Sequence, residues 1–161
     1  MWTRTWKKSE LSRGDPLTSS VSPRRATEVL IVLTILVISM GGMIRIYDAG
    51  ESCPDWPTCF GTWGFDISEE EQGEWWEENP DEADSRGSGH RYSSFQIFTE
   101  WFHRLLAGAF VGPLVILNWL LIRKEAWTSP RVKGVSSLTL GLILWQGAIG
   151  WLTVKMDNEN W

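Results

Sequence analysis

Three long apolar runs constrain this chain more than any other feature. They cover residues 29–44, 105–122 and 134–154, and none of them contains a charged side chain. A helix needs about 20 apolar residues to cross the hydrocarbon core of a bilayer, with about 17 tolerated, because it rises about 1.5 Å per residue. The third run is long enough by itself, and the others become so when neighbours such as Ala26 and Trp101 are included. We therefore predict an all-α fold, an integral membrane helical bundle with three transmembrane helices.

A cleavable signal peptide is the alternative interpretation of the first run. The run begins only at residue 29, behind a long polar tail, and the sequence "SMGGMIRIYDAG" at its end lacks a small-x-small cleavage site. We therefore expect a membrane helix there.

Basic residues predict the orientation of the helices. Cytoplasmic segments next to membrane helices are enriched in Lys and Arg. The tail before residue 27 and the link after the second run are both basic, whereas the segment between the first two runs carries an acidic cluster at 69–84. We expect a plasma-membrane protein with its N-terminus in the cytoplasm and its C-terminus outside, partnered by the lipid bilayer and by no nucleic acid. The predicted segments are a basic tail (1–26), helices at 27–46, 100–122 and 134–154, a long acidic outer loop (47–99), a basic cytoplasmic loop (123–133) and an outer tail (155–161).

The outer loop contains the only two cysteines, Cys53 and Cys59, between turn-forming Pro and Gly residues. A disulfide can form and persist outside the cell. The pair is interpreted either as a structural staple or as a redox-active pair; zinc binding is less favoured, because His90 is the only nearby imidazole. The acidic part of the loop has a composition typical of a solvated insertion without its own core, in which Trp75 and Trp76 contact the lipid headgroups and His90 is an ordinary loop histidine.

Four ionisable residues are predicted to lie at the outer ends of the first two helices. Glu100, His103 and Arg104 share one face of the second helix, which Thr99 is expected to cap, and Arg45 leaves the first helix at a similar depth. Snorkelling and the helix dipole account for the glutamate and the arginines, and Arg104 can pair with Glu100. They do not account for an imidazole, which is a good axial ligand for heme iron, and an arginine fork matches a heme propionate.

Gln146 is a lone amide in the third apolar run. It is interpreted either as the donor of a hydrogen bond between helices or as a contact to the edge of a ligand. Glycines at 108 and 112, and at 147 and 150, provide small surfaces that allow helices to approach closely.

Taken together, these motifs resemble the N-terminal half of the heme A synthase family, the membrane enzymes that finish the heme of cytochrome oxidase. The stretches "GGMIRIYDAGESCPDWPTCFG", "EWFHR" and "WQGAIGWLTV" carry the resemblance. The matching positions are Gly41, Gly42, Arg45, Cys53, Trp56, Cys59, Glu100, His103, Arg104, Gln146, Gly147, Gly150, Thr153 and Val154.

The resemblance implies that each half of the enzyme binds a heme between histidines on its second and fourth helices. It implies oxidation of the heme O methyl group to the formyl group of heme A, with a heme b in the complete enzyme. By that analogy His103 is a ligand of the heme iron and Glu100 is catalytic, while Arg45, Arg104 and Gln146 contact the cofactor. Heme O synthase and cytochrome oxidase assembly factors are the partners that the analogy implies.

The chain departs from the family pattern after its third helix, where no fourth helix with its histidine follows. We expect a fragment of a longer protein, or one part of an assembly completed by a second subunit or by further copies, and no activity from an isolated three-helix chain. Two alternatives remain: a non-catalytic heme-binding or oxidase assembly protein, and a thiol–disulfide carrier that uses Cys53 and Cys59.

Overall fold

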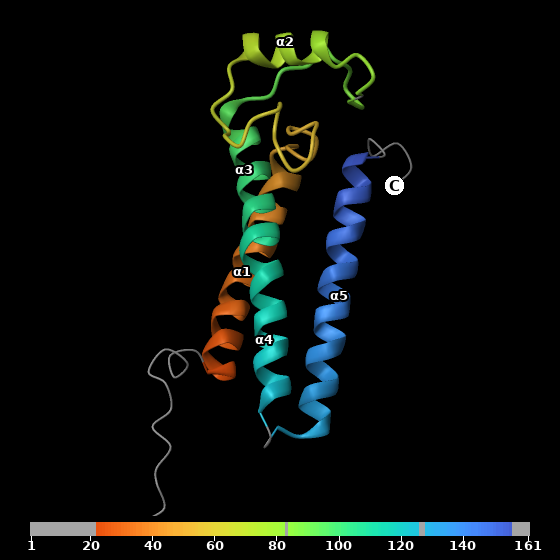
Figure 1. The fold of residues 1–161 in the computed structure, drawn as a ribbon. Helices are drawn as coiled ribbons and strands as arrows, with labels where there is room; N and C mark the ends of the chain where they lie inside the picture. Colours follow the sequence, from red (N-terminus) through yellow and green to blue (C-terminus); the bar gives the residue numbers. More distant parts are fainter. Residues whose placement is uncertain (1–21, 83, 126–127, 156–161) are drawn as a thin grey trace, which may run out of the picture.

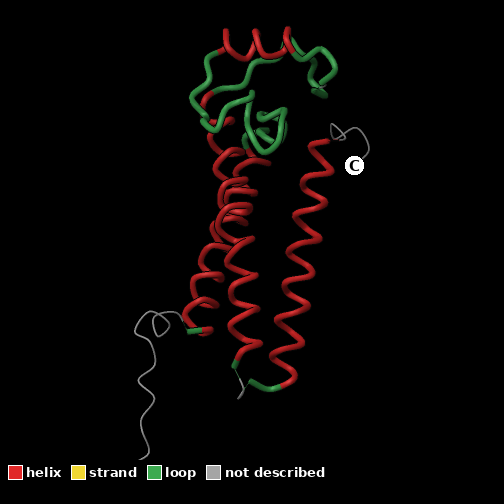
Figure 2. The backbone as a smooth tube through the Cα atoms, viewed as in Figure 1, coloured by secondary structure: helices red, strands yellow, loops and turns green. Residues whose placement is uncertain are grey.

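The computed structural model describes residues 22–82, 84–125 and 128–155, with only the backbone at 154 and 155. Most of the predicted basic tail and of the outer tail lies outside these residues. The elements are α1 (Pro23–Ile46), α2 (Glu69–Glu78), α3 (Ser94–Leu105), a π-helical turn η1 (Leu106–Val111), α4 (Gly112–Lys124) and α5 (Pro130–Lys155). Helices and loops make up the described part of the chain, without a strand (Figure 2). The predicted helical fold class is confirmed.

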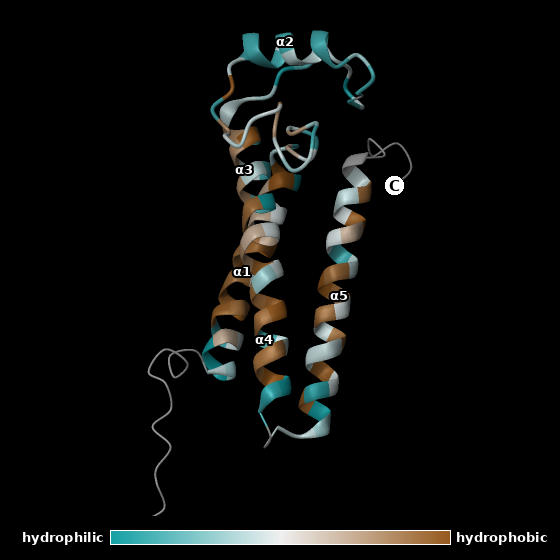
Figure 3. Cartoon of the chain, in the orientation of Figure 1, coloured by the Kyte–Doolittle hydropathy of each residue, from teal (hydrophilic) through white to brown (hydrophobic). Residues whose placement is uncertain are grey.

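Three helical segments are long and apolar enough to cross a membrane: Pro23–Ile46, Ser94–Lys124 and Pro130–Thr153. The second consists of α3, η1 and α4 in one continuous rod. Apolar side chains dominate the middle of these helices, while α2 is hydrophilic (Figure 3). The chain is therefore a membrane protein with three candidate spans, as predicted.

Each spanning helix begins before its predicted first residue, because a serine caps it. The Ser22 hydroxyl accepts from the amide of Arg25 at 3.3 Å, and Ser129 accepts from Val132 at 3.4 Å. The second span begins with a capping box, in which the side chains of Ser93 and Gln96 each accept from the backbone amide of the other. It starts at Ser94, and not near Thr99 as the sequence suggested.

A wide turn interrupts the second span between its outer and inner halves. The Gly112 amide donates to the Ala107 carbonyl, five residues back, and Pro113 follows at once. Proline has no amide hydrogen, and its ring collides with the carbonyl four residues earlier in a regular α-helix. A π-turn relieves that conflict by admitting one extra residue into the helical ladder.

The inner halves of the helices pack through α4, which contacts both α1 and α5 (Figure 1). The buried cluster is formed by Leu30, Val111 and Val115, with Leu140 of α5 among the partly buried neighbours. Two polar contacts accompany it. The Thr27 hydroxyl lies 3.2 Å from Oδ1 of Asn118, and the Trp119 indole donates to the Ser137 hydroxyl at 2.9 Å.

The outer loop has a core of its own, which contradicts the expectation that its acidic part would lack one. The core consists of Cys53, Cys59, Phe60, Ile67, Trp76, Tyr92 and Ile97. Trp76 is only 5% exposed, so it supports the loop and does not reach the headgroups as we expected. Helix α2 lies across the outer end of the bundle and covers this loop (Figure 1).

Side-chain hydrogen bonds hold the acidic insertion in place. The side-chain amide of the buried Gln72 accepts from the backbone amide of Tyr92 at 2.9 Å and donates to the Tyr92 carbonyl at 3.0 Å, so it joins α2 to the loop segment that leads into α3. Arg86 forms an ion pair with Asp48 at 2.9 Å. Burial, together with a hydrogen bond to Asp84, raises the pKa of the Tyr92 phenol well above its usual value.

Candidate functional site

The two cysteines form a disulfide beside α3, at the level of Glu100 and Arg104. The Cys53–Cys59 bond is 2.01 Å long and both residues are buried. A pair of backbone hydrogen bonds between Cys59 and Thr62, at 2.9 and 3.1 Å, closes the turn that follows. Asp55 accepts from the Thr58 hydroxyl and from the Gly61 amide, which shapes the segment inside the disulfide. The predicted disulfide is confirmed.

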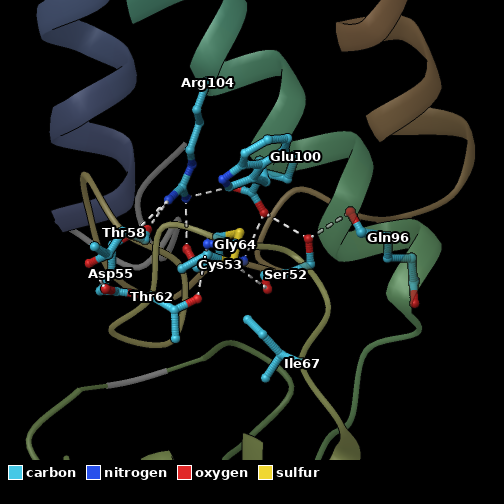
Figure 4. Close-up of a disulfide and its surroundings, with 12 residues drawn as sticks. Ser52, Cys53, Asp55, Thr58, Thr62, Gly64, Ile67, Gln96, Glu100 and Arg104 are labelled. Carbon is cyan, nitrogen blue, oxygen red and sulfur yellow. Dashed lines mark hydrogen bonds and ion pairs between the residues drawn. A yellow bond between two sulfur atoms is a disulfide. The ribbon is translucent and has the colours of Figure 1, made fainter.

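The Arg104 side chain binds backbone carbonyls of this disulfide loop. The guanidinium donates to the carbonyls of Cys53 (2.7 Å), Asp55 (2.5 Å) and Thr58 (3.4 Å), as Figure 4 shows. It also forms an ion pair with Glu100 Oε1 at 2.6 Å. Four acceptors therefore surround one arginine whose side chain is only 13% exposed. The planar guanidinium thus fixes the loop at several points, which the single ammonium group of a lysine would not do.

Glu100 holds the same loop from the other side. Its Oε2 accepts from the Cys53 amide at 2.9 Å and from the Ser52 hydroxyl at 3.0 Å (Figure 4). The residue is 6% exposed, so its charge is compensated by Arg104 and by these two donors instead of by water. We call Glu100, Arg104, Ser52 and Cys53 the loop clamp.

Ser52 is a site residue that the sequence analysis missed. Its side chain is fully buried, and its contact with Glu100 spans 48 residues along the chain. The only signal in the sequence is its position immediately before Cys53, within the stretch that carried the family resemblance.

The His103 side chain faces α1. A Cβ added at Gly41 would lie 3.6 Å from its Nε2, so the imidazole packs where α1 carries no side chain. His103 is half-buried, and its ring forms no hydrogen bond or ion pair within the described part of the chain. The ring nitrogens are therefore available for a ligand.

The structure does not bring the other predicted site residues into this cluster. Arg45 lies one turn beyond Gly41 on α1, exposed and without an ion pair to any described residue. Gln146 is exposed on α5, which contacts α4 in the inner half of the bundle. His90 packs edge-on against Tyr92, with ring centroids 4.6 Å apart, inside the acidic insertion.

A pocket of about 280 Å³ opens between the disulfide loop and the outer half of the second span. Arg104 is among the residues that line it, and His103 is not. Its lining combines the disulfide, three tryptophans and two small residues in the middle of η1: Cys53, Trp56, Pro57, Thr58, Cys59, Trp63, Trp101, Arg104, Leu105, Gly108 and Ala109. Within the described residues, no three His, Cys, Asp or Glu side chains gather into a metal site.

The comparisons with known proteins agree with the motifs of this site. Residues 24–160 match the family described as cytochrome oxidase assembly protein (COX15-CtaA). The heme A synthase of Shewanella oneidensis is 35% identical over 128 residues, which are 80% of this chain and 35% of the relative. The heme A synthase of Novosphingobium aromaticivorans is 28% identical over 141 residues, which are 82% of this chain and 39% of the relative.

A fusion of heme A synthase with a mitochondrial ferredoxin, from Schizosaccharomyces pombe, is 30% identical over 131 residues, or 76% of this chain and 20% of the relative. The chain thus spans well under half the length of the curated relatives it matches. No solved structure matches it significantly. The family match extends from α1 through the disulfide loop and the clamp to α5, and the chain belongs to the cytochrome oxidase assembly protein family that includes the heme A synthases.

Proposed function

We propose that this chain acts as part of a heme A synthase-type membrane oxidoreductase, which oxidises the methyl group of heme O to the formyl group of heme A for cytochrome oxidase. The observation that carries the proposal is the His103 imidazole, half-buried against Gly41 and without a hydrogen-bond partner among the described residues. The names of the relatives, heme A synthases that share up to 35% identity, support the same reaction. The bilayer and heme O are the partners we assign, with heme O synthase and assembly factors by analogy.

The residues present fit a heme, although not all of the predicted contacts fit equally well. His103 would bind the iron, because an imidazole with an unoccupied nitrogen is a good ligand for heme iron. Arg45, exposed and unpaired within the described residues, would bind a propionate. Arg104 already donates to three carbonyls and to Glu100, so we assign it to the loop. Gln146 would reach the cofactor only from the exposed face of α5.

Bound heme would supply the reacting methyl group and a redox-active iron. Glu100 would supply a base on the same helix, three residues before His103. A carboxylate offers about four acceptor positions. Ser52 and Cys53 occupy Oε2 and Arg104 takes one position on Oε1, which leaves one free position on Oε1. A proton released near the site can therefore be accepted at Oε1 without breaking the loop clamp.

Heme binding is tested with the purified chain in detergent. The oxidised and reduced optical spectra are recorded after hemin is added, for the wild type, His103→Ala and His90→Ala. Because His90 packs only within the acidic insertion, its replacement should leave the heme spectrum intact, while His103→Ala should lose it. A wild-type chain that remains colourless refutes the proposal.

Catalysis is tested separately, in native membranes supplied with heme O and a reductant. Glu100→Ala should abolish heme A formation while heme remains bound. If heme is lost as well, Glu100 is needed for the fold of the site and not for the oxidation.

The second candidate is a non-catalytic heme-binding or assembly protein. The observation in its favour is that three donors already hold Glu100, as expected for a residue that anchors the loop. Under this function His103→Ala loses the pigment, yet no heme A forms in membranes that contain the wild-type chain. Heme A formation by the wild-type chain in these membranes therefore distinguishes the two candidate functions.

The disulfide supports a proposed orientation of the chain. We assign the disulfide loop and α2 to the outside of the plasma membrane, where a disulfide persists, and the start of α1 to the cytoplasm. This assignment puts the beginning of α1, with its basic residues near Pro23, in the cytoplasm and the end of α1 outside. A membrane-impermeant reductant should open the Cys53–Cys59 bond in intact cells if this orientation holds.

A further inference from the structure

We propose that Ser52 is a positioning residue for Glu100: its hydroxyl fixes Oε2, so that the free acceptor position on Oε1 points in one direction. The inference rests on the proposed function for the role of Glu100 in the reaction. The contact itself is independent of heme, since Ser52 Oγ lies 3.0 Å from Oε2 and both residues are buried in the loop clamp (Figure 4).

The Ser52 hydroxyl has one hydrogen and three oxygens within reach. These are the Ala49 carbonyl (2.9 Å), the Gln96 carbonyl (3.0 Å) and Glu100 Oε2 (3.0 Å). Both carbonyls have another donor: the Ser52 amide reaches Ala49 at 3.2 Å, and the Thr99 hydroxyl reaches Gln96 at 2.8 Å. A hydrogen bond to an ionised acceptor is roughly twice as strong as one to a neutral acceptor. The hydrogen of Ser52 therefore belongs to Glu100.

This hydrogen bond matters because the last torsion of a glutamate side chain has no sharp preference. Terminal torsions between sp³ and sp² carbons are broad, so donors must set the plane of the carboxylate. The Cys53 amide at 2.9 Å and the Ser52 hydroxyl are the two donors to Oε2. Without Ser52, Oε2 would keep only the Cys53 amide as a donor, and the plane of the carboxylate would be less narrowly defined.

The chain offers a matched control for the loss of this hydroxyl. Thr99 is also fully buried, and its hydroxyl donates to the Gln96 carbonyl, which lies within reach of Ser52 as well, but no hydrogen bond joins the Thr99 side chain to Glu100. Thr99→Val and Ser52→Ala each remove one buried hydroxyl, but only Ser52→Ala removes a donor to Glu100. Ser52→Thr keeps the hydroxyl and tests whether the hydrogen bond, and not the packing, is responsible.

The first readout is the infrared spectrum of the full chain in lipid nanodiscs, without heme. The carboxylate stretching bands of Glu100 are identified as those lost in Glu100→Gln. We expect Ser52→Ala to shift these bands, and we expect Ser52→Thr and Thr99→Val to leave them in place. Unchanged bands in Ser52→Ala, or equal shifts in either of the other variants, would overturn the proposal.

The second readout is heme A formation in native membranes. A misplacement of about 1 Å can cost roughly 100-fold in rate, so Ser52→Ala should lower kcat about 10- to 100-fold with little change in KM. A band shift with unchanged kcat overturns the positioning role but leaves the proposed function intact. If the wild type forms no heme A, the proposed function fails, and the infrared bands still decide whether Ser52 orients the carboxylate.

Discussion

Replacing Arg104 with lysine tests whether the loop clamp holds the disulfide loop on α3. Arginine reaches four acceptors: the three carbonyls of Cys53, Asp55 and Thr58, and Glu100 Oε1. Lysine keeps the charge but presents its donors from a single nitrogen, which we expect to retain Glu100 and one carbonyl. Two hydrogen bonds are then lost. At about 1 to 1.5 kcal/mol each, loop opening becomes easier by about 2 to 3 kcal/mol.

The assay is hydrogen–deuterium exchange at the Cys53 amide, which donates to Glu100 at 2.9 Å in the closed loop. Since about 1.4 kcal/mol corresponds to a factor of ten, Arg104→Lys should accelerate exchange roughly 30- to 140-fold. Arg91→Lys is the control, because Arg91 also donates to three backbone carbonyls, those of Glu69, Ser88 and His90, but none belongs to the disulfide loop. Acceleration below about threefold in Arg104→Lys, or an equal effect in Arg91→Lys, refutes the reasoning.

Three further predictions concern the loop and the helix contact. Because burial raises the pKa of Tyr92, the folded loop favours the neutral phenol, so the stability of the loop should fall as pH rises above about 10. Tryptophan fluorescence followed against pH measures this fall, and Tyr92→Phe should abolish it. Tyr47→Phe, at an exposed position, is the control and should leave the fall unchanged. Gly41→Ala should keep the His103 imidazole in place, because its Cβ would make an ordinary contact at 3.6 Å, whereas Gly41→Leu should displace the ring and shift the histidine NMR signals. Ser68→Ala removes the capping box of α2 and should lower the stability of the insertion by about 1 kcal/mol, measured by urea unfolding.

Local spacing predicted the parts of the site that lie on one helix. Glu100 and Arg104 are four residues apart on α3, and their ion pair follows from helical geometry. The three membrane spans could also be predicted from the sequence, because length and hydropathy determine them. Hydropathy did not predict the caps at Ser22 and Ser93, because it marks only the apolar part of a helix and not the polar first turn before it.

Contacts between distant segments could not be predicted in the same way. The acidic composition of the insertion suggested a solvated segment, yet a few residues far apart in sequence, Gln72, Trp76 and Tyr92 among them, bury enough surface to order it. The path of the loop over α3 decides that Ser52 meets Glu100 and that Arg104 meets carbonyls. The rotation of α1 about its axis determines which of its residues faces His103, and hydropathy does not predict that rotation.

The π-turn at Leu106–Val111 allows the outer and inner halves of one membrane span to pack independently of each other. A single added residue advances a regular α-helix by about 100°, which would turn every later side chain to a new direction. Absorbed as a bulge, the same residue leaves both flanking segments in phase with their own neighbours. The outer segment can keep its register with the loop above it, while the inner segment independently keeps the facing that packs it between α1 and α5.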